Sequence, residues 1–473
     1  MGQMRILMGT PELAPLLSDG GVGEGVRALC DALRQRGDEV TAILPGLPSR
    51  EVGLVVVETF ALEGGATVRR GHSGDLPVLL VDGPLLGARS HLYGEDVGDL
   101  DSAARAAFFC RAVVELLRRE AFDVVHVHEW VAAMIPYLLR EAGLRIPSVL
   151  TIHNGMHQGL FPFEALAAFG LDGSHFHMDR LEFHGHVNLM KGGVLGARFV
   201  TTVSPTYRDE LLTPEHGELL DGVLQSRGTE FVGIENGIDR ALWDPARDAH
   251  LSARYDLDDL APKAACKAAL AEELGLDLGR PIVLSAGRII EQKGCDLVAA
   301  AMPEMVRSGA SVLVAGAGDA PLVRALEEAA AACSPHARVL GRVSDALLHR
   351  LVAGADYLVM PSRYEPCGIV QLYALRYGTV PIVRRTGGLA DTVTDASLPD
   401  GTGFLFDAPT PAALVDAVVR AVGIYRTPRL EVLRRSGMRR ESGWERPATR
   451  YRHLYDRACH DFGRADADAS QKR

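Results

Sequence analysis

The stretch that decides the fold runs from Pro361 to Thr394 and reads PSRYEPCGIVQLYALRYGTVPIVRRTGGLADTVT. An apolar strand at Tyr357–Met360 leads into it, and the spacing places Glu365 on the loop that follows this strand. Further on, the turn Thr386-Gly387-Gly388 is predicted to expose backbone N–H groups just before a helix that begins near Leu389. Because free N–H groups and the positive end of a helix dipole both attract anions, we expect this segment to bind a diphosphate without a metal ion.

An ordinary buried strand and helix, in which the glycines serve only as turn and cap residues, is the plain alternative for this segment. Fold-level periodicity alone does not require Glu365, Pro366, Cys367 and Gly368 to stand together at the end of a strand. The segment is therefore a candidate site for a nucleotide-linked sugar.

The composition bounds the class of protein. With 473 residues the chain is too long for one ordinary core, so two domains of similar size are expected. Fifty Lys and Arg side chains against sixty-one Asp and Glu give a net charge of −11, which argues against a nucleic-acid partner and against docking on an anionic membrane. No apolar run approaches the roughly 18 residues of a membrane span, and the chain opens directly into a strand, so we expect a cytoplasmic protein. Seven cysteines without a C-x-x-C pair fit reduced thiols.

Short apolar strands alternate with helical patterns along the chain, which is typical of parallel α/β folds. In the first half the expected elements are a helix over Glu24–Arg36 and strands at Arg5–Gly9, Glu39–Leu44, Val124–His126 and Ser148–Ile152. In the second half the expected strands are Pro281–Ala286, Ser311–Ala315, Arg338–Leu340, Tyr357–Met360 and Val380–Val383. Turn-forming residues from Asn236 onward mark a boundary. We therefore expect two Rossmann-like, doubly wound domains, residues 1–238 and 239–446, whose strand-end loops face a central cleft.

The first loop, SDGGVGEGV from Ser18, invites comparison with a dinucleotide site. It lacks the G-x-G-x-x-G spacing, and the second strand ends in Leu44-Pro45-Gly46 without an acid for a ribose hydroxyl. A nicotinamide or flavin enzyme is therefore disfavoured. The plain alternative is a flexible turn before a helix that Asp19 caps.

Histidines gather at or near two strand ends: His126, His128, His153, His157, His175, His177, His184 and His186. An H-x-H pair puts two imidazoles on one strand face, but no cysteine or carboxylate spacing completes a tetrahedral metal site, so we predict none. His153 and Asn154, in TIHNG, are instead candidates for binding a sugar at a strand end. A hydrogen-bonded core histidine is the alternative for any one of the eight.

Two cations, Arg288 and Lys293, follow the first strand of the second half in the segment GRIIEQKG. When a sugar leaves a nucleotide as an oxocarbenium-like species, negative charge develops on the diphosphate, and preorganised cations stabilise that change. A solvated basic pair at a helix start is the alternative, although cations are unfavourable there without an anion.

Six segments, in order, resemble bacterial glycogen and starch synthases: TIHNGMHQGLFP, NLMKGGVLGARFVTTVSPTYRDEL, GIENGIDRALWDP, GRIIEQKG, SRYEPCGIVQLYALRYGTVPIVRRTGGLADTV and GTGFLF. The resemblance runs from about Ile6 to about Phe462. It implies the GT-B fold and a retaining, metal-independent transfer of a glucosyl unit to a 4-hydroxyl. It also implies that a final helix, residues 447–462, crosses back to the first domain, and we expect the polar residues 463–473 to be disordered.

The resemblance also assigns roles to residues. Arg288 and Lys293 would hold the diphosphate, Glu365 would bind donor-sugar hydroxyls, and His153 would contact the sugar and support the developing charge. The other donor-binding residues would be Asn154, Asn236, Gly287, Arg342, Cys367, Gly368, Thr386, Gly387, Gly388 and Leu389. The diphosphate loop and the acceptor side would comprise Ser18, Asp19, Gly20, Gly21, Glu24, Glu129, His157 and Gln158.

Five positions depart from the pattern of the family. Its first motif begins with a lysine and ends with an aspartate, where this chain has Ser18, followed by Asp19, and Glu24. Its His-Asp-Trp-His reads His128-Glu129-Trp130-Val131 here, and a tyrosine that stacks on adenine is replaced in the loop Gly341-Arg342-Val343. The guanidinium of Arg342 would stack on the base or donate to a different base such as guanine.

These departures favour a specialised relative, which uses a donor other than ADP-glucose, or a cyclitol-like donor, and a small acceptor in pseudo-oligosaccharide or natural-product biosynthesis. An ordinary ADP-glucose-dependent glycogen synthase is the first alternative. An inactive glucan- or nucleotide-binding regulator is the second. In either catalytic version the partners are a nucleotide-sugar donor and a saccharide acceptor, the product is ADP or GDP, and no further cofactor is expected. A homo-oligomer is compatible with the sequence.

Overall fold

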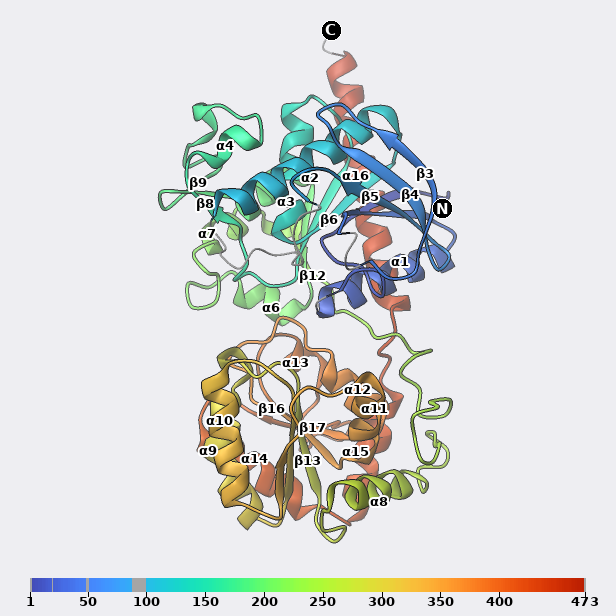
Figure 1. Cartoon of the computed structure of the whole chain (residues 1–473), viewed down its shortest axis with the longest axis vertical. Helices are drawn as coiled ribbons and strands as arrows, with labels where there is room; N and C mark the ends of the chain where they lie inside the picture. The colour runs from blue at the N-terminus through green and yellow to red at the C-terminus, as the bar shows by residue number, and fades with distance from the viewer. Residues whose placement is uncertain (1, 19, 48–50, 87–98, 472–473) are drawn as a thin grey trace. The chain divides into compact units, whose positions relative to one another are not determined.

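The computed structural model describes residues 2–18, 20–47, 51–86 and 99–471, with side chains described as far as residue 462. The chain folds as two compact units (Figure 1). The first unit contains Met1–Asn236 and Trp444–Arg473, and the second contains Gly237–Gly443. These borders lie within a few residues of those expected at 238 and 446. The first unit is therefore formed by two segments, one from each end of the chain.

The second unit is built on a parallel sheet with the strand order β15-β14-β13-β16-β17-β18. Its strands are β13 (Ile282–Ala286), β14 (Ser311–Ala315), β15 (Ala337–Val339), β16 (Tyr357–Met360), β17 (Val380–Arg384) and β18 (Phe404–Phe406). Numbered within the unit this is 3-2-1-4-5-6, the order of a Rossmann sheet. The direction of winding reverses between β13 and β16, which is where such sheets bind ligands.

Both faces of this sheet are covered, so its strands are mostly apolar. Leu284 and Leu358 point into one core, whereas Val283, Tyr357 and Val359 point into the other. The covering helices are α8 (Lys263–Leu274), α9 (Cys295–Arg307), α10 (Ala320–Ala332), α11 (Asp345–Gly354), α12 (Val370–Arg376), α13 (Gly387–Thr392), α14 (Pro411–Gly423) and α15 (Pro428–Arg439).

The first unit has a larger sheet with the order β12-β11-β7-β6-β1-β2-β5-β4-β3, in which β4 pairs antiparallel with both β3 and β5. The strands are β1 (Arg5–Gly9), β2 (Glu39–Pro45), β3 (Leu54–Ala61), β4 (Thr67–Ser73), β5 (Leu76–Asp82), β6 (Val124–His128), β7 (Ser148–Ile152), β11 (Phe199–Thr202) and β12 (Phe231–Gly233). A small separate sheet is formed by β8 (Leu160–Phe161), β9 (Glu182–Phe183) and β10 (His186–Asn188). The α-helices are α1 (Gly21–Gln35), α2 (Leu100–Arg119), α3 (Glu129–Glu141), α4 (Ala165–Ala168), α5 (Leu189–Gly196), α6 (Pro205–Glu210), α7 (Asp221–Gln225) and α16 (Glu445–Gln471).

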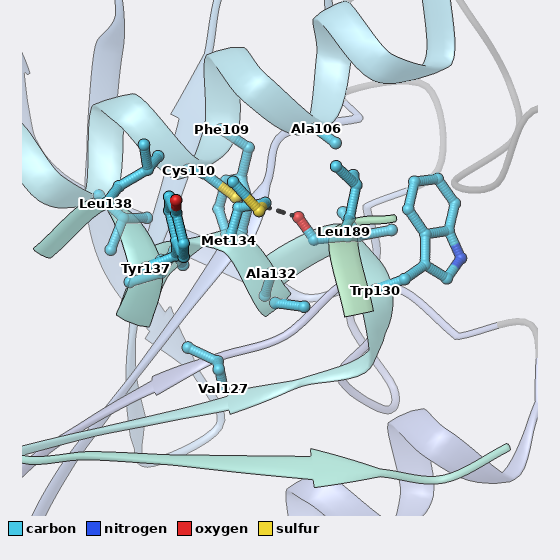
Figure 2. Close-up of a cluster of buried hydrophobic side chains, with 14 of the residues drawn as sticks. Ala106, Phe109, Cys110, Val127, Trp130, Ala132, Met134, Tyr137, Leu138 and Leu189 are labelled. Atoms are coloured by element: carbon cyan, nitrogen blue, oxygen red, sulfur yellow. Dashed lines mark hydrogen bonds between the residues drawn. The ribbon is translucent and has the colours of Figure 1, made fainter. Parts of the chain in front are cut away.

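The glycines in the segment NLMKGGVLGA let α5 pack closely against α3. A Cβ added to Gly193 would lie 2.7 Å from the carbonyl oxygen of Ala133, and one added to Gly196 would overlap the backbone at Tyr137. Figure 2 shows the cluster of buried side chains beside this contact, where the Cys110 thiol donates to the Val131 carbonyl at 3.3 Å. These glycines therefore serve packing rather than a ligand.

Helix α16 completes the core of the first unit. In Figure 1 it is drawn in red and runs along this unit. Its buried side chains join the core that β1, α1 and β2 form; they are Ala448, Tyr451, Leu454, Tyr455 and Ala458. Arg452 fixes the helix by donating to the Asp38 carboxylate at 3.1 Å and to the Gly2 carbonyl at 2.8 Å. Among the described residues, no helix is both long enough and apolar enough to cross a membrane.

The expectation of a disordered tail from residue 463 is wrong as far as Gln471, because α16 continues to that residue. The segment GRADADASQ contains no proline, and its alanines favour a helix that α16 has already nucleated.

Candidate active site

The central pair of the second unit is Lys293 and Glu365. Lys293 ends the short 3-10 helix Glu291–Lys293 that follows β13, and Glu365 lies in the loop that follows β16. The Lys293 Nζ atom is 2.6 Å from Glu365 Oε2, and the Ser362 hydroxyl donates to the same oxygen at 3.0 Å. Glu365 is only 3% exposed, whereas the Lys293 side chain is 23% exposed. The pair therefore combines a buried, fixed carboxylate with an ammonium group that a ligand can reach.

The glycine turn behind β17 holds the Glu365 loop in place. The Gly388 N–H donates to the Glu365 carbonyl at 3.0 Å, and a Cβ on Gly388 would come within 2.6 Å of the Cys367 carbonyl carbon. The Gln371 amide in turn donates to the carbonyls of Cys367 and Gly368, both at 3.0 Å. The two glycine motifs of the deciding segment are thus one interlocked unit.

The expectation of free N–H groups in the turn Thr386-Gly387-Gly388 is wrong for Thr386 and Gly388. The Thr386 N–H donates to the Arg384 carbonyl at 3.0 Å, and the Gly388 N–H donates to the Glu365 carbonyl. The physical reason is that Gly387, with φ of 42°, turns the chain into α13 two residues earlier than predicted. Close approach of two backbone segments is therefore the first role of these glycines.

A small cavity of about 70 Å³ opens beside this pair, at the carboxyl ends of β13, β14 and β16. Arg288 and Lys293 line it, together with Gly287 and Gly368. The Arg288 side chain is exposed, and no described residue forms a hydrogen bond or ion pair with its guanidinium. Two cations, one paired and one not, thus border a cavity at the point where the winding of the sheet reverses.

Arg342 lies at the same edge of the sheet, in the loop that follows β15. The Gly316 N–H donates to the Gly341 carbonyl at 2.8 Å, and the Gly287 N–H donates to the Ala315 carbonyl at 3.0 Å. These bonds link the loops of three neighbouring strands. The Arg342 side chain is exposed and has no partner among the residues that the structure describes.

In the first unit the corresponding strand ends bring Glu129 against the TIHNG loop. Glu129 starts α3 with a left-handed φ of 63°, and its Oε1 accepts from the N–H groups of His153 at 2.6 Å and Asn154 at 3.1 Å. Burial raises the pKa of Glu129 to about 8, and the Glu12 carboxylate adds to the rise, against the lowering effect of the two N–H donors. At neutral pH Glu129 is therefore mainly protonated while it fixes the backbone of the loop.

Three buried or half-buried histidines lie in a row at the same strand ends. His128 Nδ1 is 3.0 Å from His153 Nε2, and the rings of His126 and His128 have their centres 4.2 Å apart. Burial lowers the pKa of His126 to about 3, that of His153 to about 4 and that of His128 well below its usual value. All three rings are therefore neutral at physiological pH. Among the described residues, no group of His, Cys, Asp and Glu side chains is arranged to hold a metal ion.

In the first loop, the backbone is held by Glu12, an acid that was not among the predicted site residues. The Glu12 carboxylate accepts from the Gly20 N–H at 3.0 Å, and the Ser18 hydroxyl donates to the Gly20 carbonyl at 3.1 Å. Asp19 lies outside the described residues. The available signal was an acid between two prolines in TPELAP, directly after the strand Arg5–Gly9, and the structure shows that this acid is buried. Of the other predicted residues, Gly21 and Glu24 lie in the first turn of α1.

The remaining predicted residues of this unit differ in accessibility. His157 is exposed, Asn154 is half-buried, and Asn236 is buried at the end of the unit. Gln158 is also buried, and its amide is used internally: it donates to the carbonyls of Gly155 and Glu218 and accepts from Asn188. Gln158 therefore anchors loops, which its sequence position next to His157 did not reveal.

The chain is similar to proteins of known families. The family described as "Starch synthase catalytic domain" matches residues 5–226, and the family described as "Glycosyl transferases group 1" matches residues 267–426. A glycogen synthase of Anaeromyxobacter dehalogenans (strain 2CP-1) is 44% identical over 96% of this chain and 98% of its own length. Glycogen synthase 2 of Geobacter metallireducens is 41% identical over 97% of this chain and 99% of its own length.

Among solved structures, the catalytic domain of starch synthase IV from Arabidopsis thaliana, bound to ADP and acarbose, superposes with a TM-score of 0.88. It is 30% identical and covers 97% of this chain and 100% of that chain. A sucrose-phosphate synthase from Thermosynechococcus elongatus, 20% identical over 96% of this chain and 99% of its own, shares the fold with a TM-score of 0.65. The resemblance seen in the sequence is thereby confirmed, as is the GT-B class of α/β fold: the chain belongs to the glycogen and starch synthase family, whose members are hexosyltransferases of the glycogen synthase type.

Proposed function

We propose that this protein is an ordinary glycogen synthase, which transfers glucose from ADP-glucose to the terminal 4-hydroxyl of an α-1,4-glucan with retention of configuration and without a metal ion. The observation that carries the proposal is the Lys293–Glu365 pair beside Arg288 at the switch point of the second sheet. The names of the relatives support it, as does the ADP and acarbose bound to the plant starch synthase.

The proposed chemistry uses each part of the pair differently. As the bond between the anomeric carbon and the diphosphate breaks, Lys293 and Arg288 stabilise the charge that develops on the leaving ADP. Glu365 Oε1, for which no described residue supplies a partner, accepts from a hydroxyl of the sugar. The acceptor hydroxyl forms the new bond and gives its proton to the departing diphosphate. By the family resemblance, His153 would contact the sugar as a neutral ring.

The specialised relative that the sequence departures favoured now ranks second, because relatives with 40–44% identity over nearly the whole chain carry the name glycogen synthase. The departures themselves stand. The Ser18 hydroxyl donates a hydrogen bond to the Gly20 carbonyl, and the Arg342 side chain is exposed in the loop that follows β15. A donor whose base is not adenine is therefore the alternative that the titration below distinguishes.

The test is a titration of the purified protein with ADP-, GDP-, UDP- and dTDP-glucose, followed by turnover assays with maltooligosaccharide and with glycogen. We expect ADP-glucose to bind best, glycogen to be elongated, and EDTA to leave the rate unchanged. Elongation with GDP-glucose but not ADP-glucose would replace the proposal by the specialised one. Binding of ADP without any turnover would support the inactive regulator instead.

A further inference from the structure

His128 is a buried ring that contacts His153 but has no role in the chemistry proposed above. It is the last residue of β6, only 1% exposed, and its ring lies between Met8 of β1, His126 and His153. Its Nε2 atom is 2.9 Å from the Met8 sulfur, and its Nδ1 atom is 3.0 Å from His153 Nε2. Both of its ring nitrogens therefore have a partner inside the protein.

The chemistry of these partners determines where the protons lie. A thioether sulfur has no hydrogen and can only accept, so His128 Nε2 must be the nitrogen that carries the proton. A neutral imidazole has one donor and one acceptor, so His128 Nδ1 is the acceptor. The hydrogen bond between the two rings then requires His153 Nε2 to carry a proton and donate it. His153 Nδ1 is left as a lone pair, and no described residue supplies a donor to it.

We propose that His128 is a positioning residue that holds His153 in the tautomer protonated on Nε2, so that His153 Nδ1 presents a lone pair to a hydroxyl group of the bound sugar. The identity of that sugar rests on the proposed function, whereas the tautomer rests only on the contacts of His128. The commoner assumption, a histidine that donates to a sugar oxygen, is excluded at Nδ1 by this arrangement.

A separate series of hydrogen bonds occupies both ring nitrogens of His126, so that this ring does not compete with His128 for a hydrogen bond to His153. His126 Nδ1 is 2.7 Å from the Tyr455 hydroxyl, and His126 Nε2 is 2.7 Å from Thr151 Oγ1. Thr151 is in turn 2.6 Å from Thr201 Oγ1, which donates onward to the Leu150 carbonyl at 3.4 Å. His126 therefore directs both nitrogens away from His153 and supports His128 only through ring contact.

The first test reads the tautomer directly. Full-length protein with ¹⁵N-labelled histidine, without ligand, is examined by long-range ¹H–¹⁵N NMR, and the His153 signals are assigned by their loss in His153→Ala. We expect the spectrum of a ring protonated on Nε2 alone. A His153 ring protonated on Nδ1, or on both nitrogens at pH 7, would overturn the proposal. This measurement needs no folded variant of His128 and no turnover.

The second test compares three variants. His128→Asn keeps an acceptor oxygen near the place of Nδ1, so we expect the His153 tautomer and most of the kcat to survive. His128→Phe keeps the ring but removes the acceptor, and we expect a mixture of His153 tautomers and a fall in kcat of about tenfold, with KM for ADP-glucose changed less. His126→Phe is the matched control, because it removes an equally buried ring that does not contact His153.

Equal effects of His128→Phe and His126→Phe on the His153 spectrum would show a general packing defect and refute the positioning role. An unchanged spectrum in His128→Phe would refute it as well. If the wild-type protein shows the expected tautomer but turns over no ADP-glucose, the proposed function fails and the assignment of His128 stands.

Discussion

Replacing Glu129 by glutamine should remove a large part of the pH dependence of stability. In its neutral form Glu129 accepts two backbone N–H bonds through Oε1, and glutamine offers the same acceptor with an N–H₂ group in place of the O–H. The side chain is 3% exposed, and its left-handed backbone is the same for both residues. The substitution is therefore an isosteric copy of the protonated acid.

The magnitude follows from the pKa of Glu129, which is about 8 in the folded protein against a usual value of 4.5. Between these two values the folded state holds a proton that the unfolded state has released. The free energy of unfolding therefore falls as the pH rises through this window, by up to ~1.4 kcal/mol per pH unit from this group. The contribution is fully present below pH 4.5 and is lost by about pH 8. Over the window it amounts to roughly 3–5 kcal/mol in the wild type, and in Glu129→Gln it is absent.

The assay is urea unfolding of both proteins at pH 5, 6, 7 and 8. We expect the midpoints to be similar at pH 5 and to diverge as the pH rises, with Glu129→Gln the more stable at pH 8. Glu141→Gln, at the other end of α3 where the side chain is 38% exposed, controls for the loss of one carboxylate. Parallel midpoint curves for the wild type and Glu129→Gln would refute the reasoning.

Four further substitutions test the donor site. Lys293→Ala and Glu365→Ala should each lower kcat by about a hundredfold or more while weakening ADP binding less, because the pair acts mainly on the developing charge; unchanged turnover in both variants would remove them from the mechanism. Gly388→Ala should lower the midpoint of urea unfolding and abolish binding of ADP-glucose in a calorimetric titration. Gly423→Ala, whose Cβ meets nothing within 4 Å, should change neither measurement. Ser18→Lys restores the cation of the family motif, and ADP affinity measured by titration should rise about tenfold; no gain would place this loop away from the phosphates.

Sequence periodicity predicted five strands of the second sheet, because most of their side chains are apolar and buried, but it did not predict β18. Tyr357–Met360 and Ser311–Ala315 have the predicted bounds, and β17 runs one residue beyond its prediction. The apolar pattern predicted no strand between Leu44 and Val124, where the structure has β3 to β5. Strand β3 lies at the sheet edge with mostly exposed side chains, so its valines carry no burial pattern that marks a face.

The chemistry of the site was predictable by residue type but not by pairing. The spacing identified Lys293 and Glu365, yet nothing in it showed that they form an ion pair across the strand crossover. The same holds for Glu12 on the Gly20 amide and for the contact between His128 and His153. Such contacts depend on which loops the sheet order brings together, and on which atom of a side chain faces which neighbour. The spacing of residues along the chain determines neither the loops that meet nor the atoms that face each other.

The return of α16 to the first unit bears on how the chain is made. Ala448, Tyr451 and Tyr455 fill part of the core that β1 and α1 begin, yet they are synthesised after every residue of the second unit. During translation one apolar face of the first sheet therefore stays exposed until α16 has been synthesised. The second unit has by then been synthesised completely and can fold. The unit that starts first is finished last, and a ribosome that stops before Trp444 releases a chain with one completed half and one that exposes its core.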